Sequence, residues 1–191
     1  MRDWLRACAP QNARITAAER VRMFGGALFG IGLTALVSRM WLDGGDGLPM
    51  LVAPMGASAV LLFAVPASPL AQPWPVFGGN IVSALTGVTC ALLFGHGLLG
   101  AAFAVACAIL LMSLLRCLHP PGGAIALTAV VGGPVIASAG YGFALMPVAL
   151  NTGLLVLAAI LFNNLARHRY PHFADIRHDN PAGTRDQRPD D

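Results

Sequence analysis

Residues 118–127 read LHPPGGAIAL, and this stretch decides how the surrounding chain can fold. His119 precedes two prolines, so its backbone is pushed toward an extended conformation and away from the helix. Pro120 and Pro121 suit the first turn of a helix, because a backbone N–H has no partner at that position in any case. The two glycines that follow let the backbone approach a ligand or another helix closely. We therefore expect a short apolar helix to begin here.

The stretch lies in a chain with the composition of a membrane protein. Of its 191 residues, 56% are hydrophobic and 11% are charged, whereas a soluble domain carries about 25% charged residues. Between Asp46 and Arg167 the only Asp, Glu, Lys or Arg is Arg116. A surface of that length with one charge must face lipid, so we predict an integral, all-helical membrane protein.

Six apolar segments can be distinguished, and two of them are short. The four long segments are about residues 21–41, 76–94, 98–118 and 142–165, and the short segments are about 50–65 and 124–139. A spanning helix needs about 20 residues. The prediction is therefore an all-α membrane protein with four long transmembrane helices and two short helices, which either span as broken helices or are re-entrant.

The arginines predict the orientation. Five lie within residues 1–22, the last of them Arg22, and five lie within residues 167–191, so the positive-inside rule places both ends in the cytoplasm. This requires an even number of spans, four or six, and Arg116 favours six. We expect a basic N-terminus (1–20), a transmembrane domain (21–166) and a polar tail (167–191), with the chain in the plasma (inner) membrane.

The two short segments begin with a shared pattern. Residues 54–59, PMGASA, and residues 121–126, PGGAIA, both read P-x-G-A-x-A. Each short segment is followed by a longer one with an early asparagine, Asn80 or Asn151. The chain therefore resembles two copies of long–short–long, at about 21–95 and 97–166. Three spans in each copy would make the repeat inverted, an arrangement that recurs in transporters.

A helix that begins inside the membrane has free N–H groups and a positive dipole end, and a small anion satisfies both. This predicts a substrate site formed by the two motifs, the asparagines and one arginine. The candidates are His119, Pro120, Pro121, Gly122, Gly123, Pro54, Gly56, Ser58, Asn80, Asn151 and Arg116. His119 would be the titratable donor, Asn80 and Asn151 would line the cavity, and Arg116 would attract anions.

Each of these residues also has a structural interpretation. His119 would then bond to a carbonyl group at a helix end. The asparagines would form hydrogen bonds between helices, and Arg116 would mark the topology with its charged end at the interface.

The sequence offers little for other functions. It shows no nucleophile–base pair, paired carboxylates or phosphate loop, so we expect no enzyme, no catalytic residue and no cofactor. His168, His172 and His178 have no Cys or carboxylate arrangement that closes a metal site. The basic ends lack interleaved aromatics, which excludes nucleic acid as a partner. The expected partners are the lipid bilayer and a small inorganic anion, and the glycine-rich faces allow a homo-oligomer.

Three stretches resemble the HPP family of integral membrane proteins. They are His119–Ala124, Pro54–Asn80 and Leu161–Pro171, and they match in order over about residues 20–171. The family is usually described with four spans, and members in plastids and cyanobacteria are reported to move nitrite. The resemblance implies a small-anion transporter, with nitrite as the best guess. At Ile125 many relatives are expected to carry Thr, so specificity here is open.

Two alternatives remain beside anion transport. One is a membrane-embedded structural or sensory subunit that transports nothing. The other is a transporter of another small solute, although the absence of Asp and Glu between Asp46 and Asp175 argues against a cation. The sequence also leaves open whether transport would be proton symport or channel-like permeation.

Overall fold

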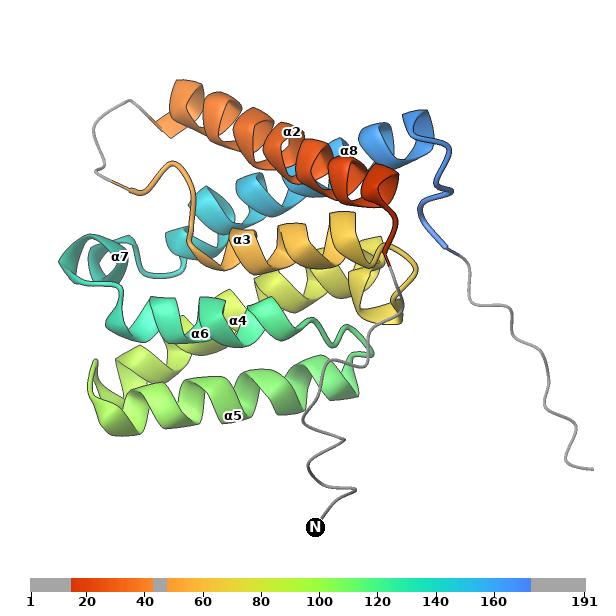
Figure 1. The fold of residues 1–191 in the computed structure, drawn as a ribbon. Coiled ribbons are helices and arrows are strands. Elements are labelled where there is room, and N and C mark those ends of the chain that lie inside the picture. Colours follow the sequence, from red (N-terminus) through yellow and green to blue (C-terminus); the bar gives the residue numbers. More distant parts are fainter. Residues whose placement is uncertain (1–14, 43–47, 173–191) are drawn as a thin grey trace, which may run out of the picture.

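The computed structural model describes residues 15–42 and 48–172, and these residues form a helical bundle without strands (Figure 1). The α-helices are α2 (Ala17–Leu42), α3 (Pro54–Ala59), α4 (Pro73–Phe94), α5 (Leu98–Leu114), α6 (Pro120–Val131), α7 (Pro134–Ala139) and α8 (Leu150–Leu165). The shorter turns are the π-helical η1 (Val60–Ala64), the 3-10 turn η2 (Pro69–Ala71) and the π-helical η3 (Ala144–Ala149). The all-helical class predicted from composition is confirmed.

Three stretches of the described residues are long and apolar enough to cross a membrane, namely Ala17–Trp41, Pro73–Phe94 and Ala144–Leu165. The predicted segment 98–118 is shorter than expected, because α5 ends at Leu114 after 17 residues. Arg116 follows with a positive φ of 53°, and a left-handed residue ends a helix.

The short segments begin where the prolines predict. Pro54 begins α3, and the helix continues through η1 to Ala64. His119 has an extended backbone (φ −136°, ψ 107°) and is the N-cap of α6. The predicted segment 124–139 needs correction, because it contains two helices, α6 and α7. Gly133, with φ of 91°, lies between them and supplies a turn that other residues rarely adopt.

The sixth predicted segment is interrupted near its start. Met146 has a non-helical backbone (φ −130°, ψ 117°) inside η3, and Pro147 follows it. Proline lacks a backbone donor and clashes with the preceding turn, which breaks the helix there. Irregular backbone inside a membrane protein is tolerated where protein or a cavity surrounds it.

The helices pack in two groups that the short helices connect. α4 packs against α5 and α6, and α2 packs against α8. α3 contacts α2, α6 and α8 and lies between the two groups (Figure 1). In the same view α2, α3, α4, α5, α6 and α8 alternate in direction along the chain, so α3 and α6 are antiparallel.

The start of α2 and the end of α8 lie on the same side of the bundle. Nη1 of Arg22, near the start of α2, donates to Oδ1 of Asn163, near the end of α8, at 2.9 Å. The outer surface is apolar, with Leu28 and Leu36 on α2 and Leu98 on α5 among its exposed side chains. Such a surface suits lipid rather than water.

Candidate functional site

The two sequence motifs meet at His119 and Ser58. Nε2 of His119 lies 2.9 Å from Oγ of Ser58, and Nδ1 lies 2.9 Å from the carbonyl oxygen of Leu70. A carbonyl oxygen only accepts, so Nδ1 carries a proton and donates it to this bond. In the neutral ring Nε2 then accepts from the Ser58 hydroxyl. His119 is 0% exposed, and both ring nitrogens are occupied by protein groups in this conformation.

The first turn of α6 has few unsatisfied donors. Pro120 and Pro121 have no backbone N–H, and the N–H of Gly122 donates to the His119 carbonyl at 2.9 Å. Pro121 and Gly122 are buried, Gly123 is half-buried and Pro120 is exposed. In this conformation the turn therefore satisfies its own early donors.

Glycine lets α6 approach α4 and α5 closely. A Cβ on Gly122 would lie 2.5 Å from Oγ of Ser83 and 2.9 Å from Sδ of Met112. A Cβ on Gly79 of α4 would lie 2.6 Å from the Cys117 carbonyl oxygen. Larger residues at either position would push α6 away from α4, so these glycines fix where His119 lies.

The first turn of α3 is similar to that of α6. Pro54 is buried and has no N–H, and the N–H of Met55 donates to the Val52 carbonyl at 2.9 Å. The N–H of Gly56 donates to the Ala53 carbonyl at 3.0 Å. Gly56 is exposed, and a Cβ there would meet no atom within 4 Å.

Asn151 holds the chain segment that leads into α3. Its Oδ1 accepts from the N–H of Val52 at 3.0 Å, and its Nδ2 donates to Oγ of Ser38 and to the Met50 carbonyl. The amide of Asn151 therefore has partners at both of its polar atoms.

Asn80 differs from Asn151 in its partners. Its Nδ2 donates to Oγ1 of Thr152 at 3.2 Å, and the Thr152 hydroxyl lies 3.9 Å from Sδ of Met55, to which it donates. Oδ1 of Asn80 is buried and has no hydrogen-bond partner. A buried acceptor without a partner costs about 1–3 kcal/mol, so this oxygen needs an explanation.

These polar side chains form three hydrogen-bonded pairs near α3, Ser38–Asn151, Asn80–Thr152 and Ser58–His119, which we call the buried polar line. Its members are Ser38, Asn151, Thr152, Asn80, Ser58 and His119, each 0% exposed. Asn151 and Thr152 are neighbours in the chain, and Met55 and Ser58 lie one turn apart on α3. The line follows α3 from the segment before it to the loop after η1.

The structure does not bring Arg116 into this line. Arg116 lies three residues before His119 in the link between α5 and α6, but its side chain is exposed. Of the other predicted residues, His119, Ser58, Asn80 and Asn151 are in the line, and the prolines and glycines form the helix starts beside it.

The loop of residues 66–72 binds two distant parts of the chain, His119 and residues 170–172. Its Leu70 carbonyl accepts from His119, and its Ala71 carbonyl accepts from the Tyr170 hydroxyl at 2.7 Å. Oε1 of Gln72 accepts from the N–H of His172 at 2.7 Å.

Tyr170 is 2% exposed, and burial raises the pKa of its hydroxyl, which keeps it a donor. Tyr170 lies in the predicted tail and was not among the candidate residues predicted from the sequence.

The three stretches that meet at this loop are the ones that resemble a known family. The sequence-family model of the HPP transmembrane region matches residues 12–171 of this chain. The chain belongs to the HPP transmembrane family. Two transmembrane proteins of Dictyostelium discoideum are each 40% identical to it, over 131 and 128 residues and 64% of this chain. The HPP chain spans 44% and 41% of the length of these relatives. No solved structure matches.

A second buried cluster in this HPP chain lies where η1 ends. Nη2 of Arg22 donates to the Phe63 carbonyl at 2.9 Å, and Nε of Arg22 lies 3.0 Å from both carboxylate oxygens of Glu19. Nδ2 of Asn163 donates to the Leu62 carbonyl at 3.0 Å. Arg22 was counted among the arginines that mark the topology, although its position within the first predicted apolar segment could have indicated a buried role.

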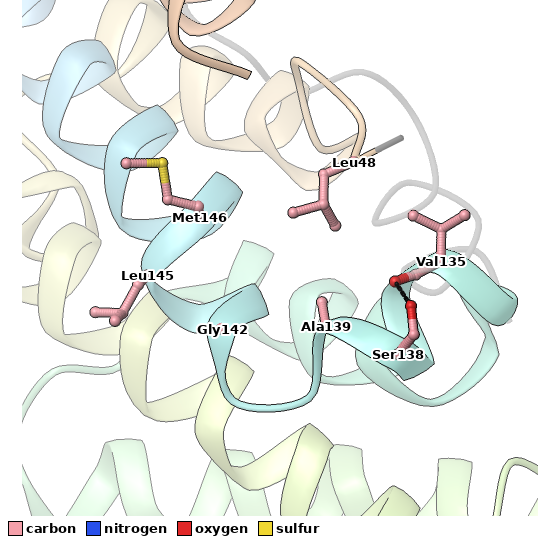
Figure 2. A pocket seen from close by; sticks show the side chains of 7 residues that line it. All are labelled: Leu48, Val135, Ser138, Ala139, Gly142, Leu145 and Met146. Carbon is pink, nitrogen blue, oxygen red and sulfur yellow. Dashed lines mark hydrogen bonds between the residues drawn. The ribbon is translucent and has the colours of Figure 1, made fainter. Parts of the chain in front are cut away.

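A cavity of about 440 Å³ lies beside the break in the last long segment (Figure 2). Its lining residues are Leu48, Val135, Ser138, Ala139, Gly142, Leu145 and Met146. Figure 2 shows Met146 and Leu48 on one side and Ser138 on the other, with the Ser138 hydroxyl donating to the Val135 carbonyl. None of the predicted site residues lines this cavity. Its lining residue Leu48 lies two residues before Met50, whose carbonyl accepts from the amide of Asn151.

No metal centre is evident in residues 15–42 and 48–172, where no group of three or more His, Cys, Asp or Glu side chains could hold an ion. His178, residues 1–14 and residues 173–191 lie outside the described residues. The expectations of no metal, no cofactor and no enzymatic activity stay predictions.

Proposed function

We propose that this HPP-family chain is a membrane transporter, not an enzyme, and that it carries a small inorganic anion, with nitrite as the best candidate. The observation that carries the proposal is the buried polar line. Polar side chains inside a membrane protein are costly and mark solute pathways. Hydrogen bonding between helices accounts for most of the line, but not for the unpartnered Oδ1 of Asn80.

The arrangement of the helices supports an inverted repeat as part of the proposal. α2, α3 and α4 would form one copy, and α5, α6 and α8 the other. The packing of α2 against α8 then corresponds to the packing of α5 against α4, and α3 meets its counterpart α6. Asn80 is seven residues from the start of Pro73–Phe94, and Asn151 is seven residues from the start of Ala144–Leu165.

Six membrane crossings follow from this repeat, with both ends of the chain on one side. The positive-inside rule makes that side cytoplasmic in the plasma (inner) membrane. The HPP relatives in Dictyostelium discoideum are likewise described as transmembrane proteins.

The substrate would pass between α3 and α6, near the middle of the bundle. Transporters with inverted repeats bind their substrates there, at discontinuous helices. Because both nitrogens of His119 are occupied, the described conformation is closed at this point. Separation of α3 from α6 would break the bond between Ser58 and His119 and open a path between the two helices for the solute. Arg116, exposed at the link to α6, would attract anions toward the site.

Nitrite uptake into proteoliposomes tests the proposal. Purified full-length protein and protein-free vesicles are compared at mildly alkaline pH, where the neutral acid that leaks through lipid is scarce. We expect protein-dependent uptake, which Asn80→Leu reduces. Thr128→Val is the matched control, because the Thr128 hydroxyl bonds only to the Ala124 carbonyl of its own helix. Uptake equal to protein-free vesicles for nitrite, nitrate and formate would favour a structural or sensory subunit.

A further inference from the structure

We propose that the anion passes Asn80 as its protonated, uncharged acid, so that the chain carries weak oxyacids such as nitrous or formic acid and rejects anions of strong acids. The inference rests on the proposed transport function and names its substrate class. It makes transport an electroneutral symport of one anion with one proton.

The free atom at Asn80 is a hydrogen-bond acceptor. Nδ2 donates one of its two N–H groups to Oγ1 of Thr152, whose hydroxyl donates onward to Met55, and Oδ1 is the polar atom of Asn80 without a partner. A carbonyl oxygen carries partial negative charge and repels a bare anion. The O–H group of a weak acid donates to the same oxygen, which removes the cost of leaving a buried acceptor unpaired.

Among the residues that the structure describes, none places a partner cation beside Oδ1 of Asn80. The titratable or charged side chains on α4, on the elements packed against it and in the link to α6 are Cys90, Cys107, Arg116, Cys117 and His119. Two further titratable side chains lie in links, His96 between α4 and α5 and Tyr141 between α7 and η3. Arg116 is exposed. The nitrogens of His119 are bonded to Ser58 and Leu70, and the Tyr141 hydroxyl is paired with Thr89.

A bare anion beside Asn80 would therefore be buried without a partner charge, which is far costlier than burying a neutral molecule. On the side of the membrane from which it enters, the anion takes one proton from hydronium and becomes the acid, and hydronium becomes water. On the far side, the acid returns the proton to water and leaves as the anion. Atoms and charge balance, and no oxidant or reductant is needed.

The test separates electroneutral from electrogenic transport. Proteoliposomes with the full chain receive either an outside-acid pH gradient or an inside-positive potential set by potassium and valinomycin, and uptake in protein-free vesicles is subtracted. We expect the pH gradient to drive protein-dependent nitrite and formate uptake and the potential to have no effect. Formate should compete with nitrite, and nitrate should neither compete nor enter.

Asn80 is tested in the same assay. Asn80→Leu removes the acceptor and is expected to reduce protein-dependent nitrite uptake about tenfold, while Thr128→Val retains it. Elution of each variant as a single species in detergent shows that it is folded. Asn80→Ser, which keeps a small acceptor, is the second variant and is expected to retain more uptake than Asn80→Leu.

Nitrite uptake that follows the potential, or nitrate uptake at a similar rate, would overturn the inference and leave anion transport intact. Uptake equally fast in Asn80→Leu and in the unmodified protein would overturn the role of Asn80. The absence of protein-dependent uptake for every anion would overturn both the inference and the proposed function.

Discussion

The hydroxyl of Ser58 lies 2.9 Å from Nε2 of His119, and this contact joins α3 to the residue that precedes α6. The other ring nitrogen donates to the Leu70 carbonyl. One imidazole ring therefore connects three segments that are 61 and 49 residues apart in the chain. In this conformation His119 acts as a junction, and the predictions below begin from it.

Ser58→Ala should lower the free energy of unfolding by about 1–3 kcal/mol, because Nε2 of His119 loses its buried partner. Thermal denaturation in detergent measures the change. Thr128→Ala is the control and should cost less, because its hydroxyl bonds within its own helix. Equal losses in the two variants would contradict a junction at Ser58.

Substitutions at His119 should separate its two bonds. The amide of His119→Asn can still reach the Leu70 carbonyl from the Nδ1 position, and the longer amide of His119→Gln can still reach Ser58. Each should be more stable to heat than His119→Ala, which loses both bonds. If all three variants kept the thermal stability of the unmodified protein but lost uptake equally, His119 would be a proton donor to substrate instead.

Tyr170→Phe should destabilise the protein by about 1–3 kcal/mol at neutral pH, because the buried Ala71 carbonyl loses its donor. The pKa of Tyr170 is raised by burial, so the folded state keeps its proton to higher pH than the unfolded state. This contribution is complete below the ordinary tyrosine pKa of about 10 and is lost as pH rises above it. The free energy of unfolding, measured across this pH range, should fall as pH rises, and the fall should be smaller in Tyr170→Phe than in the unmodified protein.

Arg22→Met should destabilise the protein by about 1.5–3 kcal/mol or more, since the Phe63 carbonyl and Glu19 both lose a charged donor. Arg169→Gln removes an exposed arginine from the same end of the bundle and should change stability little. Denaturant-induced unfolding of both variants in detergent measures the two changes in stability. Similar losses of stability in the two variants would mean that Arg22 acts only through net charge.

Cysteine labelling should show six crossings. Ala67 is exposed and lies four residues after Phe63, which Arg22 binds, so Ala67→Cys should react from the cytoplasmic side. Gly97 is exposed just before α5, and Gly97→Cys should react from outside. The native cysteines are replaced first, and the reverse pattern of labelling would indicate four crossings.

The helix starts were predictable from local rules, whereas several helix ends were not. Prolines mark the starts of α3 and α6 because they lack a donor and fix φ. The end of α5 depends on Arg116 in a left-handed conformation, which its residue type does not indicate. Gly133 could be read as an ordinary membrane glycine, so the separation of α6 from α7 was missed.

The candidate site was only partly predictable for a related reason. The sequence identified His119, Asn80 and Asn151 as unusual, but their partners are distant. Asn151 binds residues 99 and 113 positions away, and Tyr170 binds a carbonyl 99 positions away. Spacing within a segment cannot encode such pairs, and two asparagines in similar positions therefore differ in whether their oxygens are satisfied.

The contacts of Tyr170 and His172 also set the limit of the cooperative unit. Hydropathy alone would end it at Leu165, where the last apolar helix stops. The bonds to Ala71 and Gln72 extend it to at least His172. A chain that is shortened for expression or fused to a reporter should therefore keep residues 166–172. A chain cut at the end of α8 would lose the hydrogen bonds of Tyr170 and His172 to the loop that binds His119.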